Sequence, residues 1–510
     1  MRAFVLCFMI VMALGAGGRA FGQGDEPWAD RASLARDAAL LLDALESLHP
    51  ALLRHQTAED WAARKAVFSK TYGAAQGRRD AYGALLRLLG AVSDGGLSLP
   101  PERQTGPIKA WMAEQPGLPF RLAVGADALH VQADASTSQR IQPGERITAI
   151  NGVPVARLLA RLADLVPRDA PPDALDGIDG PPPWHQALHL TGRVDFPLLD
   201  RLLPLVAPPE GGRYRLTMTG ADGVSYSLSV AAISAEARHA RLRARDSLPE
   251  RLVQDGWAFH FLDEGFAYLD VGLLTSWTMD LDWRRFIQEA IDRAGAGPAP
   301  AMLIDLRGVS GGDEQVLDLL ARQLAHRPLS GERVVKRLAR AEVPTALRPH
   351  LTTWNPAFYD WRDQSTPLAG GGVSLNGPDG AVVRVPRLEK AFAGPVVLLV
   401  DGANREEAFA FARLMKNSGR ARLVGAVTGG SLRGVTGRPS LILTLPASGF
   451  RVRLPLIDRH VPGDRPAHGV LPHESVSPNP AEDSDDPVFQ RALATARRLA
   501  GEGSDQGGAQ

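Results

Sequence analysis

A short apolar run that leads into a glycine-rich turn is the feature that most limits how this chain can fold. Residues 303–312 read Leu-Ile-Asp-Leu-Arg-Gly-Val-Ser-Gly-Gly, and helix-forming sequence begins near Asp313. Such a run, bounded by glycines and followed by helical sequence, predicts a buried strand, a turn and a helix. The glycines let backbone N–H groups converge where side chains would block them. Gly308, Gly311 and Gly312 are therefore candidates for an oxyanion-type loop, which acts in catalysis only beside a nucleophile.

Segments typical of strands and segments typical of helices alternate through residues 255–495. Apolar runs suited to strands occur at 266–272, 302–306, 396–400 and 423–427, with helical segments at 281–294, 313–326 and 405–417. This succession predicts an α/β domain with a mostly parallel sheet covered by helices. Ligands of such sheets bind beyond the carboxyl ends of the strands. The turns after Leu306 and Val400 both lie at that edge, so we expect the functional site there.

Residues 28–115 have the apolar spacing of helices and predict a helical N-terminal domain. Leucines and alanines repeat at helical spacing over 34–48. A second helix is expected from Thr57, because Asp60 three residues later makes an imperfect capping box with it. A third helix is expected over 79–92.

Residues 118–235 change to short apolar runs separated by turn residues, and they predict a β-rich module. Pro143-Gly144 and Asn151-Gly152 each indicate a turn that leads into a strand. Strands are expected at 129–131, 141–147 and 150–155, and a hairpin at 213–233 closes the module.

A long insert at 328–392 separates a predicted helix from the next strand. Its aromatic residues are Trp354, Phe358, Tyr359 and Trp361. Inserts of this length are often lids or binding loops, and the alternative is a cluster that packs on the domain. The tail, residues 501–510, is rich in Gly and Gln and is expected to be disordered.

The N-terminus has the features of a secretory signal. Arg2 supplies a positive charge, residues 3–15 are apolar but too short to span a bilayer, and small residues end at Gly22. We expect residues 1–22 to be a cleaved signal peptide, with an uncleaved anchor as the alternative. No later segment reaches about 18 consecutive apolar residues, so no stable membrane span is expected after cleavage. These features predict a periplasmic or secreted bacterial protein.

The only cysteine, Cys7, lies inside the apolar part of that signal. The mature chain would therefore have no disulfide, no thiolate nucleophile and no cysteine metal site. Metal-ligand spacings such as His-Glu-x-x-His are also missing from the sequence, so no cofactor is expected. The formal net charge of +0 favours neither a nucleic acid nor an anionic membrane as a partner.

Residues 305–312 resemble the Asp-Leu-Arg-Gly-Asn-x-Gly-Gly turn of the C-terminal processing (tail-specific) serine peptidase family. Further segments that share the family's pattern are 395–419, Gly425–Gly430, Leu445–Gly449 with the alternating Phe450–Leu456, and Gly469–Pro472 ahead of Asp486-Pro487. The resemblance extends over roughly residues 28–495. It implies a helical N-terminal part, a PDZ-like module and a ClpP/crotonase-like catalytic domain, with a peptide or unfolded protein segment as the partner. Residues 141–155 resemble the later half of a PDZ domain, and a β-rich module without a peptide site is the alternative.

The serine position of that family falls on a glutamate in this chain. Aligning Phe411-Ala412 and Asn417-Ser418-Gly419 without gaps puts Glu406 where the family has its nucleophile. A carboxylate is a far poorer nucleophile toward an amide, and it would meet a developing oxyanion with like charge. A structural interpretation of Glu406 and Glu407 is that they complement the dipole of a helix start.

The bases of the family are replaced as well. One branch uses a lysine in a Thr-x-Gly-Lys-Gly turn, and Ser431 stands at that lysine. The other branch uses a histidine in Gly-Asp-Gly-His, and Gly96 stands at that histidine. The catalytic positions that the resemblance implies are therefore Glu406, Ser431 and Gly96, which is the pattern of a degenerate member, or pseudoenzyme.

Three interpretations of function follow. The first is a peptidase-fold protein that has lost proteolysis and binds peptides or protein partners, because the nucleophile and base positions are replaced. The second is an active serine-type endopeptidase with relocated catalytic residues, for which Ser431, or less readily Ser310, is the hydroxyl. The third is another hydrolase or lyase that uses the anion-binding turn with Glu406 as acid or base. We expect the first.

Overall fold

The parallel sheet predicted for the second half of the chain is the centre of the structure. The computed structural model describes residues 28–178, 182, 188, 198–245, 256–272, 274–297, 299–476 and 486–507. The six strands of the central sheet lie in the order β19-β16-β15-β9-β8-β7. They are Ala258–Phe261 (β7), Ala267–Asp270 (β8), Met302–Asp305 (β9), Val396–Val400 (β15), Arg422–Gly425 (β16) and Glu474–Ser475 (β19). All neighbours run parallel except β7 and β8, which confirms the predicted α/β class.

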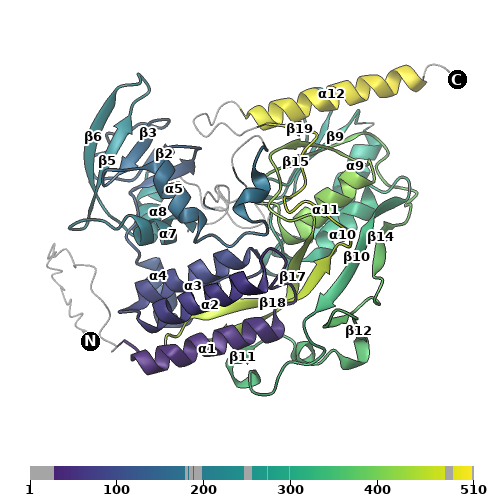
Figure 1. Cartoon of the computed structure of the whole chain (residues 1–510). Coiled ribbons are helices and arrows are strands. Elements are labelled where there is room, and N and C mark those ends of the chain that lie inside the picture. The colour runs from purple at the N-terminus through teal and green to yellow at the C-terminus, as the bar shows by residue number, and fades with distance from the viewer. Residues whose placement is uncertain are drawn as a thin grey trace, which may run out of the picture.

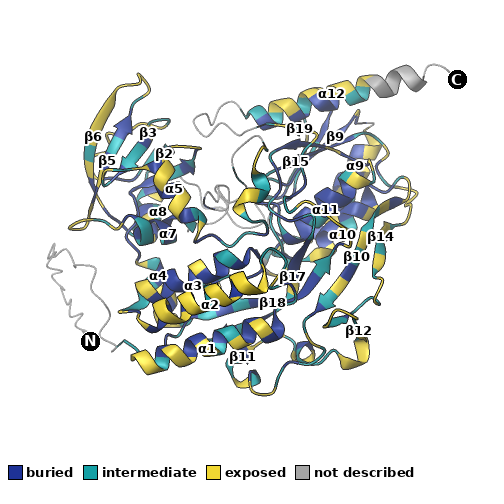
Figure 2. Cartoon of the chain, in the orientation of Figure 1, coloured by how far each residue is buried: buried dark blue, intermediate teal, exposed yellow. Residues whose placement is uncertain are grey.

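Helices cover both faces of this sheet (Figure 1). They are α9 (Trp283–Ala296), α10 (Glu314–Gln323), α11 (Glu406–Asn417) and α12 (Pro487–Gly507). Successive side chains of a strand point to opposite faces, and β9 and β15 follow this rule. Ile304 and Leu398 join the core that α9, α10 and α11 share, whereas Leu303 and Val397 join the core under α12. Figure 2 shows these central strands in the dark blue of buried residues.

A second sheet, which is antiparallel and has seven strands, was not predicted from the sequence. Its order is β11-β17-β18-β10-β13-β12, with β14 paired to β10. The strands are Leu329–Leu338 (β10), Leu351–Thr352 (β11), Thr366–Pro367 (β12), Val373–Ser374 (β13), Ala381–Val385 (β14), Gly434–Thr444 (β17) and Arg451–His460 (β18). The long hairpin of β17 and β18 extends from the central sheet to the N-terminal helices (Figure 1).

The N-terminal helices cover that hairpin. They are α1 (Arg31–Leu48), α2 (Ala58–Gly73), α3 (Arg78–Val92) and α4 (Gly106–Ala113). Leucines of α1 and α3 share one core with Leu443 of β17 and Leu454 of β18. The capping box at Thr57 and Asp60 is complete, since each side chain accepts a hydrogen bond from the backbone N–H of the other. The three helices predicted here are confirmed.

The β-rich module has a single antiparallel sheet in the order β1-β2-β3-β5-β6, with the short β4 paired to β3. Its elements are Phe120–Val124 (β1), Leu129–Asp134 (β2), Arg146–Ile150 (β3), Val153–Pro154 (β4), Arg213–Thr219 (β5), Ser225–Ala231 (β6), Val155–Ala163 (α5), Leu198–Val206 (α7) and Ala235–Arg243 (α8). The predicted hairpin and the Asn151-Gly152 turn are confirmed, and both turn residues have positive φ. The strand expected over 141–147 begins only at Arg146, because Pro143-Gly144 still forms a turn before it.

The insert at 328–392 packs on the domain through most of its aromatic residues. Phe358 is buried and joins the N-terminal core, Tyr359 and Trp361 pack against that core, and Trp354 remains 76% exposed. The short 3₁₀ helices are Pro101–Arg103, Pro172–Leu175, Ser276–Thr278, Arg348–His350, Pro356–Tyr359 and Arg362–Gln364.

At the ends of the chain, the expected signal peptide lies outside the described residues. α12 extends to Gly507, through most of the segment for which a disordered tail was expected. Within the described part of the chain, no helix is long and apolar enough to cross a membrane.

Candidate functional site

The turns that follow β9 and β15 are tied together at the carboxyl edge of the central sheet. The N–H of Gly308 donates to Asp401 Oδ2 at 3.0 Å. Asn404 Nδ2 donates to the carbonyl oxygens of Leu306 and Val309, at 2.5 and 2.8 Å. The two turns therefore form one rigid unit at the edge where a ligand of such a sheet would bind.

Glu406 begins α11 directly beside this unit. It is only 5% exposed, and its φ of 48° lies in the left-handed region. A sharp strand-to-helix turn of this kind is the geometry that presents a nucleophile in other hydrolases. The carboxylate of Glu406 lies against Gly311, since a methyl group on that glycine would collide with it. The structure thus brings Glu406 to the glycine turn, as the alignment implied.

Arg453 of β18 joins the serine-equivalent and histidine-equivalent positions. Its Nη2 donates to Glu406 Oε1 at 2.6 Å, and its Nε donates to the carbonyl oxygen of Gly96 at 2.9 Å. Burial opposes the charged guanidinium, but the Glu406 carboxylate outweighs it and raises the pKa of Arg453 above its ordinary value. An ion pair therefore stands at the position that the resemblance implies for the nucleophile, and the same arginine binds the backbone at the position that it implies for the histidine.

Glu407 occupies one of the candidate oxyanion donors. Its Oε2 accepts a hydrogen bond from the N–H of Gly312 at 3.2 Å, and its Oε1 lies 3.1 Å from Arg459 Nη1. Burial raises the pKa of Glu407, and Arg459 opposes this rise. The glycine turn is thus an anion-binding turn whose bound anion is a carboxylate of the same chain.

The Gly96 position has no room for a side chain as the structure stands. A methyl group there would collide with Thr436 Oγ1, and the N–H of Gly96 donates to Asp94 Oδ1 at 2.7 Å. Burial works against the charge of Asp94, but His49, Arg54 and Thr436 together lower the pKa of its carboxyl below the usual value. A histidine at residue 96 would require this buried cluster to rearrange.

The two hydroxyl candidates do not join the site. Ser431 is fully buried, and within the described residues its Oγ only accepts a hydrogen bond from the N–H of Arg433 at 3.3 Å. Ser310 lies in the glycine turn and makes no side-chain hydrogen bond to any described residue. Neither hydroxyl is thus paired with an imidazole or an amine in the described part of the chain.

Asp401 is the remaining titratable group of the two turns. Burial raises the pKa of its carboxyl to about 6, although the N–H groups of Gly308 and Ala403 stabilise the charged form. Through its hydrogen bond from the N–H of Gly308, Asp401 holds the glycine turn in place.

Sequence reasoning missed Arg453, Arg459 and Asp94. The alternation of apolar and polar residues over 450–456 predicts a strand on which Arg451 and Arg453 share a face. That pattern does not tell which helix the face meets, because the partners are far apart in sequence.

Comparisons with known proteins agree with this architecture. Residues 270–476, from the end of β8 to β19, match the model of peptidase family S41. Crystal structures of CPAF are similar to the chain in fold. A CPAF mutant has a TM-score of 0.59 and 14% identity, over 92% of this chain and 96% of that one. Mature CPAF complexed with lactacystin has a TM-score of 0.59 and 14% identity, over 92% and 98%.

Among curated proteins, none matches the chain. The match over residues 270–476 contains both the glycine turn and the start of α11, which are the segments that carried the resemblance to the tail-specific peptidases. Residues 270–476 therefore form a domain of peptidase family S41, a family of serine peptidases.

Proposed function

We propose that this chain is a periplasmic or secreted member of the S41 family that binds a peptide or unfolded protein segment without cleaving it. The observation that carries the proposal is the buried ion pair between Glu406 and Arg453 at the nucleophile position. The location rests on the secretory features of residues 1–22.

Peptide hydrolysis by a serine peptidase needs a hydroxyl that attacks and a base that takes its proton. Glu406 offers no hydroxyl, and the arginine beside it stays protonated and cannot act as a base. The N–H of Gly312, which could stabilise an oxyanion, already binds Glu407. Each of the three requirements of the mechanism is therefore unmet at this edge of the sheet.

Contacts for a peptide are still available next to the glycine turn. Trp277 is 53% exposed, and the guanidinium of Arg438 lies 4.2 Å from the centre of its ring. Ser276, the neighbour of Trp277, donates to Asp313 at the end of the turn. An exposed aromatic ring beside a cation is typical of protein and peptide interfaces.

A binding experiment tests the proposal. Fluorescence anisotropy of a labelled casein peptide should show saturable binding to the purified chain, and Trp277→Ala should weaken it by roughly tenfold. Trp354→Ala, which removes a still more exposed tryptophan from the insert, should leave the affinity unchanged. Equal losses in both variants, or no binding, would contradict the assignment of this surface.

A cleavage assay tests the absence of proteolysis. Unstructured casein should remain intact after incubation with the purified chain, as followed by gel electrophoresis. Glu406→Ser alone should not create activity, because the described part of the chain places neither an imidazole nor an amine beside that position. Cleavage by the wild-type chain would overturn the proposal.

Family membership favours a second candidate, an active serine-type endopeptidase with relocated catalytic residues. If casein is cleaved, Ser431→Ala and Glu406→Ala distinguish the alternatives. Loss of cleavage only in Ser431→Ala would support relocation of the nucleophile. Loss only in Glu406→Ala would support a hydrolase in which this carboxylate is the acid or base.

A further inference from the structure

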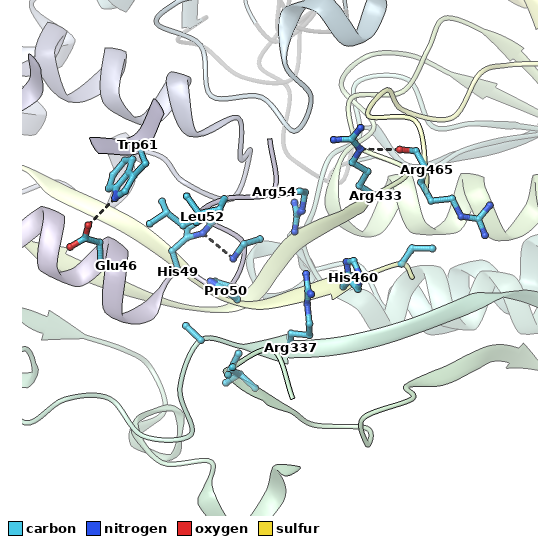
Figure 3. Close-up of a pocket in the computed structure, with 18 of the residues that line it drawn as sticks. Glu46, His49, Pro50, Leu52, Arg54, Trp61, Arg337, Arg433, His460 and Arg465 are labelled. Carbon is cyan, nitrogen blue, oxygen red and sulfur yellow. Dashed lines mark hydrogen bonds between the residues drawn. The ribbon is translucent and has the colours of Figure 1, made fainter. Parts of the chain in front are cut away.

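A cavity of about 700 Å³ lies next to Asp94, since its lining residues His49 and Arg54 are within ion-pair distance of that carboxylate. Its walls are the loop after α1, β10, the glycines at 370–372, the end of β18 with the loop at 463–465, and Arg433 (Figure 3). None of the residues that contact Glu406 or the 308–312 turn lines it. It is therefore a site separate from the one described above.

Arginines dominate one end of this cavity. Arg54, Arg337, Arg433 and Arg465 all line it. Arg54 and Arg337 share a single buried carboxylate, Asp458. The Arg54 side chain is only 5% exposed, and its Nε and Nη1 have no hydrogen-bond partner. Arg54 Nη1 also lies 3.9 Å from Asp94 Oδ2, so these two guanidinium groups face two buried carboxylates, Asp458 and Asp94.

Arg433 is the cation of the cavity that these carboxylates do not pair. Its Nε donates to the carbonyl oxygen of Arg465 at 2.9 Å, and no carboxylate of the described chain lies within ion-pair distance of it. Arg465 is paired with Glu332 at 3.3 Å. Arg433 therefore presents its remaining N–H groups in a fixed position without an internal anion to receive them.

The other end of the cavity is apolar. Figure 3 shows Trp61 at the end opposite Arg433 and Arg465, with Pro50 and Leu52 between Trp61 and these arginines, and Leu53 also lines the cavity. The carboxylate at this end, Glu46, accepts a hydrogen bond from Trp61 and pairs with Lys65. The cavity thus offers an apolar wall at one end and guanidinium groups at the other.

We propose that this cavity binds a small amphiphilic anion, with its carboxylate or phosphate group at Arg433, Arg337 and Arg54 and its apolar part against Leu53 and Trp61. Guanidinium groups recognise both anions through paired N–H donors. A volume of about 700 Å³ is in the range of pockets for small organic ligands.

Isothermal titration calorimetry of the purified chain tests this site with three probes: phenyl phosphate, phenylacetate and the uncharged phenol. Both anions should bind at least about tenfold more tightly than phenol, because each gains charge-assisted hydrogen bonds that phenol cannot form. The tighter of the two identifies which anion chemistry the site prefers.

Two variants and a control locate the binding. Arg433→Gln should weaken both anions by roughly tenfold and leave phenol unchanged. Leu53→Glu, at a position that is 50% exposed and so tolerates charge, should weaken all three probes. Arg285→Gln, which removes an exposed arginine of α9 outside the cavity, should change nothing. Equal affinity for phenol and the anions, or anion binding that survives both cavity variants, would overturn the proposal.

Discussion

The glycine-turn site and the cavity contain the same kinds of charged groups but arrange them differently. At the glycine turn, Glu406 and Glu407 each have an arginine of their own, Arg453 and Arg459. In the cavity, four arginines line the walls against the carboxylates of Glu46 and Asp464, and no carboxylate of the described residues lies within ion-pair distance of Arg433. The first site is closed by its own ion pairs, whereas the second keeps both space and charge for a ligand. The number of internal counter-ions therefore decides which of two arginine-rich sites remains open.

The largest effect is expected from breaking the closed site. Arg453→Met should lower the free energy of unfolding by about 3 to 5 kcal/mol, because it leaves the Glu406 carboxylate buried without a partner. Urea denaturation measures this loss. The double variant Glu406→Leu with Arg453→Met should recover most of it, since no unpaired charge remains. A double variant that is as unstable as Arg453→Met would show that the charge is not the cause.

The next largest effect is a dependence of the free energy of unfolding on pH, caused by Asp401. Its folded pKa of about 6 lies above the ordinary value of 3.8, so the protonated form is favoured in the folded state. The stability that it contributes is present below about pH 4 and is lost as the pH rises through 6, by up to about 3 kcal/mol.

Asp401→Asn removes this titration. Urea denaturation of both proteins across this pH range should show the variant gaining stability relative to the wild type as the pH rises. The difference should become constant above about pH 7. Parallel curves for the two proteins would contradict the assignment of the raised pKa.

A smaller effect is expected from filling the closed site. Gly311→Ala places a methyl group against the Glu406 carboxylate and should cost about 1 to 3 kcal/mol of unfolding free energy. In a thermal unfolding series, adding Glu406→Ala should relieve part of that cost, because the carboxylate is removed while the Cβ of residue 406 still lies 2.8 Å from the added methyl group. Additive losses would instead show that the two residues are not in contact.

The smallest effect on stability is expected in the cavity, in contrast to the closed site at Glu406. Arg433→Gln should change the free energy of unfolding by less than about 1 kcal/mol, because no internal ion pair is lost. The same substitution is expected to reduce anion binding, so stability and affinity separate at this residue. If Arg433→Gln lowered the free energy of unfolding as much as Arg453→Met, Arg433 would stabilise the fold as strongly as Arg453 does.

The sequence predicts the central sheet well because its strands are buried on both faces. The run Val396–Val400 is apolar at every position, and the strand has those same limits in the structure. By contrast, β17 and β18 are half-buried and carry arginines and threonines, so their pattern is weaker and the second sheet was not predicted.

The candidate site is predictable only in part, for a related reason. The turn motif and the alignment point to Glu406 and Gly96, and these two do meet on one arginine. Arg453 itself comes from a hairpin that crosses to the central sheet, and such long-range pairing is not encoded in local periodicity. Ser431 shows the converse, because alignment alone implied a place in the site and the structure gives its hydroxyl only a local backbone contact.

The left-handed backbone at Glu406 has an energetic consequence for the whole edge of the sheet. A residue with a Cβ in this region carries a torsional cost of order 1 to 3 kcal/mol, which glycine would avoid. Glycine at this position would, however, remove the partner of Arg453. The salt bridge and the unfavourable torsion are therefore coupled: the attraction to Arg453 offsets the cost of a bend that the local sequence does not favour. The ion pair with Arg453 therefore acts together with the hydrogen bonds of Asp401 and Asn404 to hold the shape of this edge.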